Sequence, residues 1–174
     1  MRHQLRINRA PVLTLWGDVV AEHLGYDRDA ALTLGRAVAG LNAQSKGQHL
    51  HLFEKPKAPT AAEAQRRARQ PKQKRVPLLG RSVPVVQRPE GLRAVAGGRP
   101  VKPAAVERYL EQKFGAAVAD ARAAMDELAS AYEPDELAQR AYDLYEKFRP
   151  EVPAGARGWG AKGTLDLDAI RKLA

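Results

Sequence analysis

Residues 11–52 read PVLTLWGDVVAEHLGYDRDAALTLGRAVAGLNAQSKGQHLHL, and they predict two helices joined by a short turn. Apolar side chains recur in the first half at spacings of three and four residues, which places them on one helix face: Leu13, Trp16, Val20 and Leu24. Gly25 is the residue type that commonly ends a helix, and Asp27 is a good N-cap for the next one. The second helix is expected to end at residues 45–47.

This helix–Gly–helix arrangement resembles a helix-turn-helix, in which the second helix enters the major groove of DNA. The candidate nucleic-acid contacts in the second helix are Arg28, Thr33, Arg36 and Lys46. Two features favour a buried second helix instead. Asp27 and Asp29 at its start would repel phosphates, and its apolar residues surround it almost completely. A hairpin packed in the core or in a dimer interface is therefore the alternative.

The charge of the chain is concentrated in its first part. The net charge is +9, and residues 1–102 contain 19 Lys and Arg against 7 Asp and Glu, whereas residues 103–174 contain 10 against 13. A basic half attracts polyanions, of which nucleic acid is the most common. The alternative is a solvated surface whose arginines reflect the composition of the genome.

Residues 54–75 contain eight basic residues, three prolines and no large apolar side chain, so they predict a linker or arm. Within it, residues 60–63 fit a helix capping box, and Pro71 would end the short basic helix that follows. The cations of this arm are candidate contacts to a phosphate backbone: Arg66, Arg67, Arg69, Lys72, Lys74 and Arg75. A solvated spacer is the alternative.

Short β-rich runs flank the arm. Residues 48–53 alternate in polarity and predict a short strand with His49 and His51 on one face, but a third metal ligand is lacking nearby. After the arm, β-branched runs predict a small sheet, with a hairpin turn at Gly97–Gly98. Prolines in two of these runs exclude a central strand, so the sheet is expected to be small and edge-like. The arginines that would project from it are Arg81, Arg88, Arg93 and Arg99.

The last part of the chain predicts further helices. A long helix is expected from Pro103, with an apolar stripe suited to a core face or a dimer seam and a bend at Gly115. Another helix begins near Pro134 and ends before Pro150, and Asp166 is expected to cap a short final helix. Residues 155–163 form a Gly-rich loop whose candidate anion-binding residues are Arg157, Gly158, Gly160 and Lys162. The alternative is that Trp159 holds this loop against the helices.

Several classes of protein are disfavoured. No apolar run approaches the roughly 20 residues of a membrane span, and the lack of cysteine removes thiolate sites and disulfides, which fits the cytoplasm. No nucleophile elbow is present, and all four histidines lie in the first 51 residues, away from the acidic helices. We therefore expect no enzyme, no cofactor and no bound metal.

The sequence as a whole predicts a mainly α fold with a small β-hairpin element, of the α+β class. Its expected segments are an N-terminal helical hairpin resembling a helix-turn-helix (1–53), a basic linker or arm (54–75), short strands (76–102) and a C-terminal helical domain (103–174). The expected function is binding of nucleic acid, most simply DNA, by a regulator or nucleoid-associated factor that forms a homodimer through its C-terminal helices. The alternative is a non-enzymatic structural or adaptor protein whose N-terminal helix pair binds a protein partner.

Overall fold

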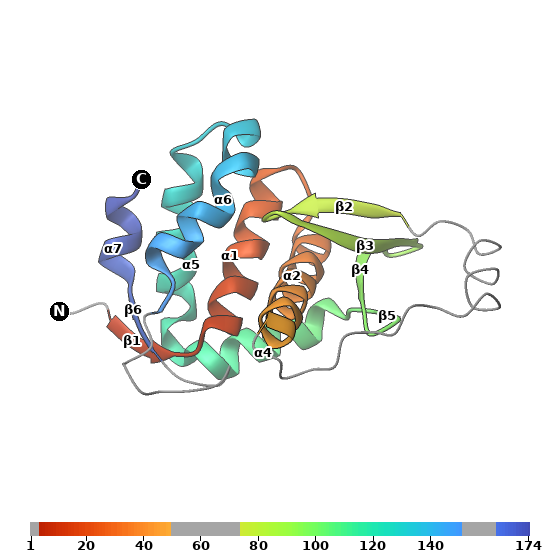
Figure 1. Ribbon diagram of the computed structural model, residues 1–174, viewed down its shortest axis with the longest axis horizontal. Helices are drawn as coiled ribbons and strands as arrows, with labels where there is room; N and C mark the ends of the chain where they lie inside the picture. Colours follow the sequence, from red (N-terminus) through yellow and green to blue (C-terminus); the bar gives the residue numbers. More distant parts are fainter. Residues whose placement is uncertain (1–3, 50–73, 151–162) are drawn as a thin grey trace.

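The computed structural model describes residues 4–49, 74–150 and 163–174, with backbone alone for residues 43–49 (Figure 1). The first elements along the chain are β1 (Gln4–Ile7), α1 (Arg9–His23) and α2 (Arg28–His49). The strands β2 (Arg75–Leu78), β3 (Arg81–Arg88), β4 (Gly91–Ala96) and β5 (Arg99–Pro100) follow. The last elements are α4 (Pro103–Phe114), a 3₁₀ turn η1 (Gly115–Ala117), α5 (Val118–Ser130), α6 (Pro134–Phe148), β6 (Gly163–Asp166) and α7 (Leu167–Lys172).

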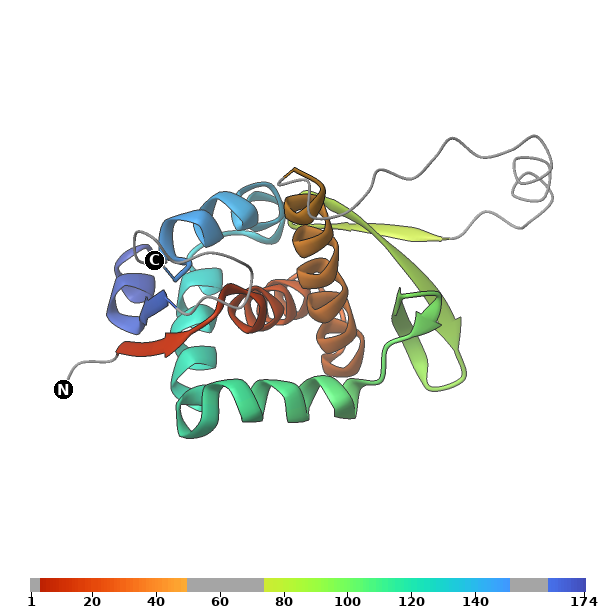
Figure 2. The ribbon, with the colours of Figure 1, turned by 60° about the horizontal axis from the view of Figure 1, so that its bottom comes forward.

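Helix α1 lies at the centre of the molecule (Figures 1 and 2). Helix α2 packs along one side of α1, and α5 and α6 pack on the other side. The antiparallel sheet, in the order β2-β3-β4-β5, covers the far side of α2. The predicted combination of helices with a small antiparallel sheet is confirmed.

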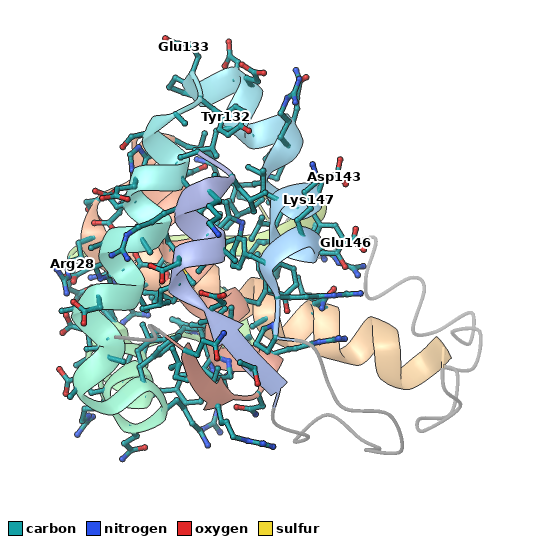
Figure 3. The ribbon with its side chains drawn as sticks, turned by 90° about the vertical axis from the view of Figure 1, so that its left-hand side faces the viewer. Arg28, Tyr132, Glu133, Asp143, Glu146 and Lys147 are labelled. Atoms are coloured by element: carbon teal, nitrogen blue, oxygen red, sulfur yellow. The ribbon has the colours of Figure 1, made fainter. Side chains whose placement is uncertain are left out.

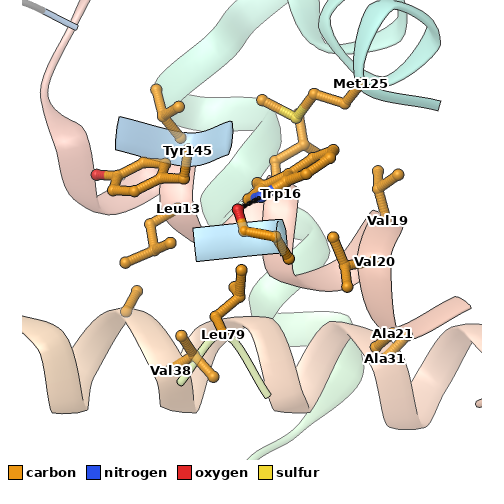
Figure 4. Packing of buried hydrophobic residues seen from close by; sticks show 14 of the residues in the cluster. Leu13, Trp16, Val19, Val20, Ala21, Ala31, Val38, Leu79, Met125 and Tyr145 are labelled. Carbon is orange, nitrogen blue, oxygen red and sulfur yellow. Dashed lines mark hydrogen bonds between the residues drawn. The ribbon is translucent and has the colours of Figure 1, made fainter. Parts of the chain in front are cut away.

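Helix α1 is enclosed on all sides, because every residue from Pro11 to Ala21 is buried. Trp16 is its largest buried side chain, and its indole N–H donates a 2.8 Å hydrogen bond to the carbonyl oxygen of Ala141 on α6 (Figure 4). The ring of Phe148 meets the Trp16 ring edge-on, with centroids 5.3 Å apart. Burial of a large aromatic ring with its polar atom satisfied makes Trp16 a main contact between the first and last parts of the chain.

The crossing of α1 and α2 depends on two glycines. A Cβ atom added to Gly17 would lie 2.8 Å from the Cα atom of Gly35. A Cβ atom added to Gly35 would lie 2.7 Å from the backbone nitrogen of Asp18 and would also collide with the carbonyl oxygen of Thr14. These neighbours are backbone atoms, which cannot move aside as a flexible side chain can. The two helix axes approach this closely only because neither residue has a side chain.

Helix α2 begins as predicted but ends later. The Asp27 carboxylate accepts a 2.8 Å hydrogen bond from the backbone N–H of Ala30, as an N-cap does. The helix then continues to His49, so the predicted end at residues 45–47 is wrong. The predicted strand over residues 48–53 is also wrong at Gln48 and His49, which are helical, while residues 50–53 lie outside the described residues.

The prediction that the prolines exclude a central strand is wrong for Pro84, because it lies in β3, an inner strand of the sheet. Both prolines nevertheless lie at positions where they break no pairing. Pro77 lies in the edge strand β2, opposite Ser82. Pro84 lies in β3 opposite Arg75 of β2, and the pairing of β3 with β4 begins one residue later, at Val85. Strand β3 thus pairs with β2 through its first half and with β4 through its second half. The predicted turn at Gly97–Gly98 joins β4 to β5.

The predicted long C-terminal helix is interrupted at Gly115. Its backbone has φ 59° and ψ −136°, which side-chain-bearing residues rarely adopt, so α4 ends there and α5 leaves in a new direction (Figure 2). The apolar stripe that spans both helices is nevertheless buried in the core of its own chain: Val106, Leu110, Phe114, Ala121, Met125 and Leu128. These side chains therefore form a core face and are not exposed as a dimer seam.

The two ends of the chain meet in a second small sheet. Strands β1 and β6 are antiparallel, with Leu5 opposite Leu165. The pairing partner of β1 lies more than 150 residues along the chain, and no local pattern predicts it. Asp166 caps α7 as expected, accepting from the backbone N–H groups of Asp168 and Ala169. One hydrophobic cluster contains buried residues from the N-terminal helices, the sheet and the C-terminal helices alike.

Candidate nucleic-acid interface

The four-stranded sheet has an inner face toward α2 and an outer face away from it. Val83 and Val85 of β3 are buried, as is Ala94, which lies opposite Val85. Because successive side chains point to opposite faces, the residues between them belong to the outer face. The strand register places Arg75, opposite Pro84, and Arg88, at the end of β3, on this outer face. Arg93, opposite Val86, has the same place in the register, but its side chain is buried and reaches Asp29 at the start of α2.

The outer sheet face, defined by Arg75, Arg88, Arg93 and Lys102, carries charge of mainly one sign. Residues 74–102 contain seven Lys and Arg and a single acidic residue, Glu90. Five of the cations are exposed: Lys74, Arg75, Arg88, Arg99 and Lys102. Arg75 lies opposite Pro84 of β3. The four residue steps from Pro84 to Arg88 span roughly 13 Å, which is the rise of about four base pairs of DNA.

Two other arginines of the sheet have partners within the protein. Arg81 donates a 3.2 Å hydrogen bond to the side-chain oxygen of Asn42 on α2. The Arg93 side chain is only 9% exposed and lies 3.8 Å from the Asp29 carboxylate. These contacts attach the sheet to α2 and hold the outer sheet face in a fixed orientation.

Thr33 was a predicted nucleic-acid contact, and the structure corrects this. Its hydroxyl is completely buried, donates to the carbonyl oxygen of Ala30 and accepts a 2.9 Å hydrogen bond from the backbone N–H of Ala94. Val101, the residue after β5, donates its backbone N–H to the Ala94 carbonyl oxygen, whereas the Ala94 N–H is bonded to Thr33. Thr33 therefore anchors β4 to α2 and is not available to a base edge.

The arginines of α2 face α4. Arg28 forms a 2.8 Å ion pair with Glu107, which raises the pKa of the already basic guanidinium. The Arg36 guanidinium lies over the ring of Tyr109, 4.4 Å from its centroid, in a cation–π contact. From Ala30 to Ala39 only Arg36 is even partly exposed. Helix α2 is thus enclosed along this stretch and presents no face suited to a DNA groove.

The remaining predicted contacts are placed differently by the structure. Lys74 and Arg75 are exposed at the start of β2, beside the outer sheet face. Lys46 lies in α2, where the backbone alone is described. The other predicted residues lie outside the described residues: Arg66, Arg67, Arg69 and Lys72 of the arm, and Arg157, Gly158, Gly160 and Lys162 of the Gly-rich loop.

The sequence prediction did not include Arg88, Arg93 and Lys102 among its candidate contacts, although it expected Arg88 and Arg93 to project from the sheet. Polar–apolar alternation along β3 assigns Arg88 to the outer face, but it cannot show that Arg93 lies across from Val86. That relation depends on the register between β3 and β4. The common face of these cations is therefore a tertiary feature.

A second charged region lies between α1 and α5, next to the start of α2. A groove of about 480 Å³ is lined there by Glu22, His23, Arg28, Arg122 and Asp126, with Val19, Ala119 and Ala123. Its charges are paired with one another: His23 lies 2.6 Å from Asp126, and Arg122 lies 3.2 Å from Glu22. The groove therefore has no excess of one sign to attract a polyanion.

Beneath this groove lies a buried carboxyl group. Asp18 has no solvent exposure, and one of its oxygens lies 2.7 Å from the Arg122 guanidinium. Burial raises the pKa of Asp18 to about 7; the nearby Glu22 carboxylate also raises it, while Arg122 lowers it. This cluster joins α1 to α5, and its protonation state changes near neutral pH.

Charges of both signs lie on the outer side of α6, where Figure 3 shows Asp143, Glu146 and Lys147 pointing away from the core. Among the residues that the structure describes, no group of three or more His, Asp or Glu side chains is arranged to hold a metal ion. None of the described helices combines the length and apolar character needed to cross a membrane.

Known proteins offer no guide to this site. Comparison of the chain with models of protein families, with curated proteins and with solved structures gave no match.

Proposed function

We propose that the protein binds DNA through the phosphate backbone, with the outer sheet face as the described part of the interface. The observation that carries this proposal is the set of exposed cations over residues 74–102, where Glu90 is the only acidic residue. Cations that neutralise phosphates release counterions from DNA, which supplies affinity without sequence preference. A nucleoid-associated factor or a regulator with weak sequence preference fits this mode of binding.

The predicted basic arm supports the same proposal through its position in the chain. Residues 54–73 lead directly into Lys74 and Arg75, at the edge of the outer sheet face. Cations of the arm would therefore add contacts next to those of the sheet. The helix pair α1–α2 serves as the scaffold, and the helix-turn-helix likeness is not needed for this mode of binding.

The alternative of a protein partner bound by the helix pair has less support. Helix α1 is buried from Pro11 to Ala21, and α2 is almost entirely buried from Ala30 to Ala39. These helices have little surface left to offer another protein. The apolar stripe of α4 and α5 is likewise used within the chain, so the expected homodimer would need a different surface.

A salt titration of binding to a random-sequence DNA duplex tests the proposal. The sheet variant replaces Lys74, Arg75 and Arg88 by Gln, and the arm variant replaces Arg66, Arg67, Arg69 and Lys72 by Gln. The control replaces Lys113, Lys147 and Lys172 by Gln; these are exposed lysines of α4, α6 and α7 and give the same change in net charge as the sheet variant.

We expect the logarithm of the binding constant to fall linearly with the logarithm of the salt concentration. Each lost phosphate contact should reduce the slope by about 0.9, so the sheet variant should lose up to about 3 and the control almost nothing. Absence of binding by the unmodified protein at about 50 mM salt contradicts the proposal. An equal effect of the control would also contradict it, because net charge alone would then explain the binding.

A further inference from the structure

The outer sheet face contains a pocket where the sheet meets the start of α4. Its volume is about 340 Å³, within the range of small-molecule sites. Its polar lining comes from Arg88, Glu90, Arg93 and Lys102, and Pro100, Val101 and Pro103 complete it. We call it the β5–α4 pocket. Three cations and one carboxylate give the lining of this open pocket a net positive charge.

Arg93 is the fixed cation of the pocket. Its side chain is nine-tenths buried, yet a guanidinium has five N–H donors. Within the described part of the chain, its partners are the Leu92 carbonyl oxygen, to which it donates a 2.9 Å hydrogen bond, and the Asp29 carboxylate at 3.8 Å. These two partners hold the guanidinium in place at the wall of the pocket. A phosphate oxygen is a further acceptor that a guanidinium group can bind.

The start of α4 adds to the positive character of the pocket. Lys102 is the N-cap residue, its side chain forms no capping hydrogen bond, and the first turn of the helix contains no acidic residue. Helix starts favour Ser, Thr, Asp or Asn at the N-cap and carboxylates in the first turn, because the dipole is positive there. A lysine at this end is unfavourable in the absence of an anion, and a bound anion would interact with both the lysine and the helix end.

Glu90 balances part of this charge when the pocket is empty. Its carboxylate lies 3.6 Å from Nε of Arg88, and both side chains are about half exposed or more. The ion pair is therefore weak, because water screens it. A ligand with several acceptor oxygens can replace this single carboxylate at Arg88.

We propose that the β5–α4 pocket binds a phosphate ester group, with Arg88, Arg93 and Lys102 as its ligands. The proposal rests on the proposed function for its source of phosphate, because the outer sheet face would bring a DNA backbone to this pocket. Planar guanidinium groups match the oxygens of phosphate in pairs, and Lys102 adds a mobile point charge. The remaining volume would accommodate the sugar to which the phosphate is attached.

The test is isothermal titration of the full chain with inorganic phosphate and with thymidine 5′-monophosphate, with thymidine as the ligand that lacks phosphate. The variants are Arg88→Ala, Lys102→Ala and Glu90→Gln. Arg108→Ala is the matched control, because Arg108 is an exposed arginine of α4 that belongs neither to the outer sheet face nor to the pocket lining. Chloride salts keep the ionic strength constant, and each variant is first checked for an unchanged unfolding transition.

We expect both phosphates to bind and thymidine not to bind. Arg88→Ala and Lys102→Ala should each weaken phosphate binding about tenfold or more, Glu90→Gln should strengthen it, and Arg108→Ala should leave it unchanged. Phosphate binding that is absent, or equally sensitive to Arg108→Ala, overturns the assignment of the pocket.

The same variants separate this inference from the proposed function. Binding of phosphate that depends on Arg88 and Lys102, without any binding of duplex DNA, supports the pocket with a free phosphate ester as ligand and contradicts the DNA-binding proposal. Salt-dependent DNA binding without phosphate binding supports the proposed function and overturns the pocket.

Discussion

The Asp18 carboxylate lies 2.7 Å from the Arg122 guanidinium in a position where Asp18 has no contact with solvent. Both residues lie on central helices, Asp18 in α1 and Arg122 in α5. The ion pair is one of the few polar contacts inside the core, and neither Asp18 oxygen accepts a well-aligned hydrogen bond from the described residues. Two predictions follow from this arrangement.

The first prediction concerns pH. Folding raises the pKa of Asp18 from 3.8 to about 7, so between these values the folded chain holds a proton that the unfolded chain releases. The contribution of Asp18 to the free energy of unfolding therefore decreases as the pH rises from about 4 to about 7, by about 1.4 kcal/mol for each pKa unit at most. Asp18→Asn should remove this dependence, so its stability relative to that of the unmodified protein should increase from about pH 4 to about pH 7 and stay constant at higher pH.

Urea unfolding at a series of pH values measures this difference. Asp120→Asn, an exposed residue of α5, is the control and should run parallel to the unmodified protein. If the free energy of unfolding of Asp18→Asn also changed with pH in parallel with that of the unmodified protein, the buried carboxyl group would not change its protonation in this range.

The second prediction concerns the partner. Arg122→Gln leaves Asp18 and Glu22 without their common cation, and a buried carboxylate without a cation is strongly unfavourable. We expect a loss of about 3 kcal/mol at pH 8 and a smaller loss at pH 5, where Asp18 can take up a proton. Arg140→Gln, which breaks an exposed ion pair with Glu136, should cost less than about 1 kcal/mol at either pH. An equal loss at both pH values for Arg122→Gln would argue against the charge explanation.

The third prediction concerns the helix crossing. Gly35→Ala introduces a Cβ atom against backbone atoms of α1 and should destabilise the protein by about 1–3 kcal/mol or more. Gly40→Ala is the matched control in the same helix, since its added Cβ atom meets no neighbour and alanine favours a helix by up to ~1 kcal/mol. Thermal unfolding should therefore shift in opposite directions for the two variants. A harmless Gly35→Ala would mean that the two helices can separate without cost.

The fourth prediction concerns the attachment of the sheet. Thr33→Val keeps the shape of the side chain but leaves the buried Ala94 N–H without an acceptor, which should cost about 1–3 kcal/mol. Thr33→Ser keeps the hydroxyl and should lose less, chiefly the contacts of one methyl group. Amide hydrogen exchange provides a specific measurement, because the Ala94 N–H should exchange faster in Thr33→Val only. Unchanged exchange there would exclude this hydrogen bond as the anchor.

Local signals in the sequence determined much of the secondary structure. The spacing of Leu13, Trp16 and Val20 predicted α1, Asp27 and Asp166 were identified as caps, and Gly97–Gly98 marked the β4–β5 turn. These features depend on residues a few positions apart, whose effect on the backbone is largely independent of the rest of the fold. The concentration of positive charge before residue 103 was also evident from the sequence alone.

Tertiary structure decided which surfaces remain available. A single apolar stripe on α1 could not reveal that α2, α5 and α6 enclose the helix completely, and Thr33 looked like a possible DNA contact until its partner at Ala94 was known. The common face of Arg75, Arg88 and Arg93 depends on strand register, and the pairing of β1 with β6 joins opposite ends of the chain. Such relations arise from contacts between distant segments, which are selected by the packing of the whole core. The sequence therefore determined the local elements and the charge, whereas the packing decided which charged residues lie together and which are buried.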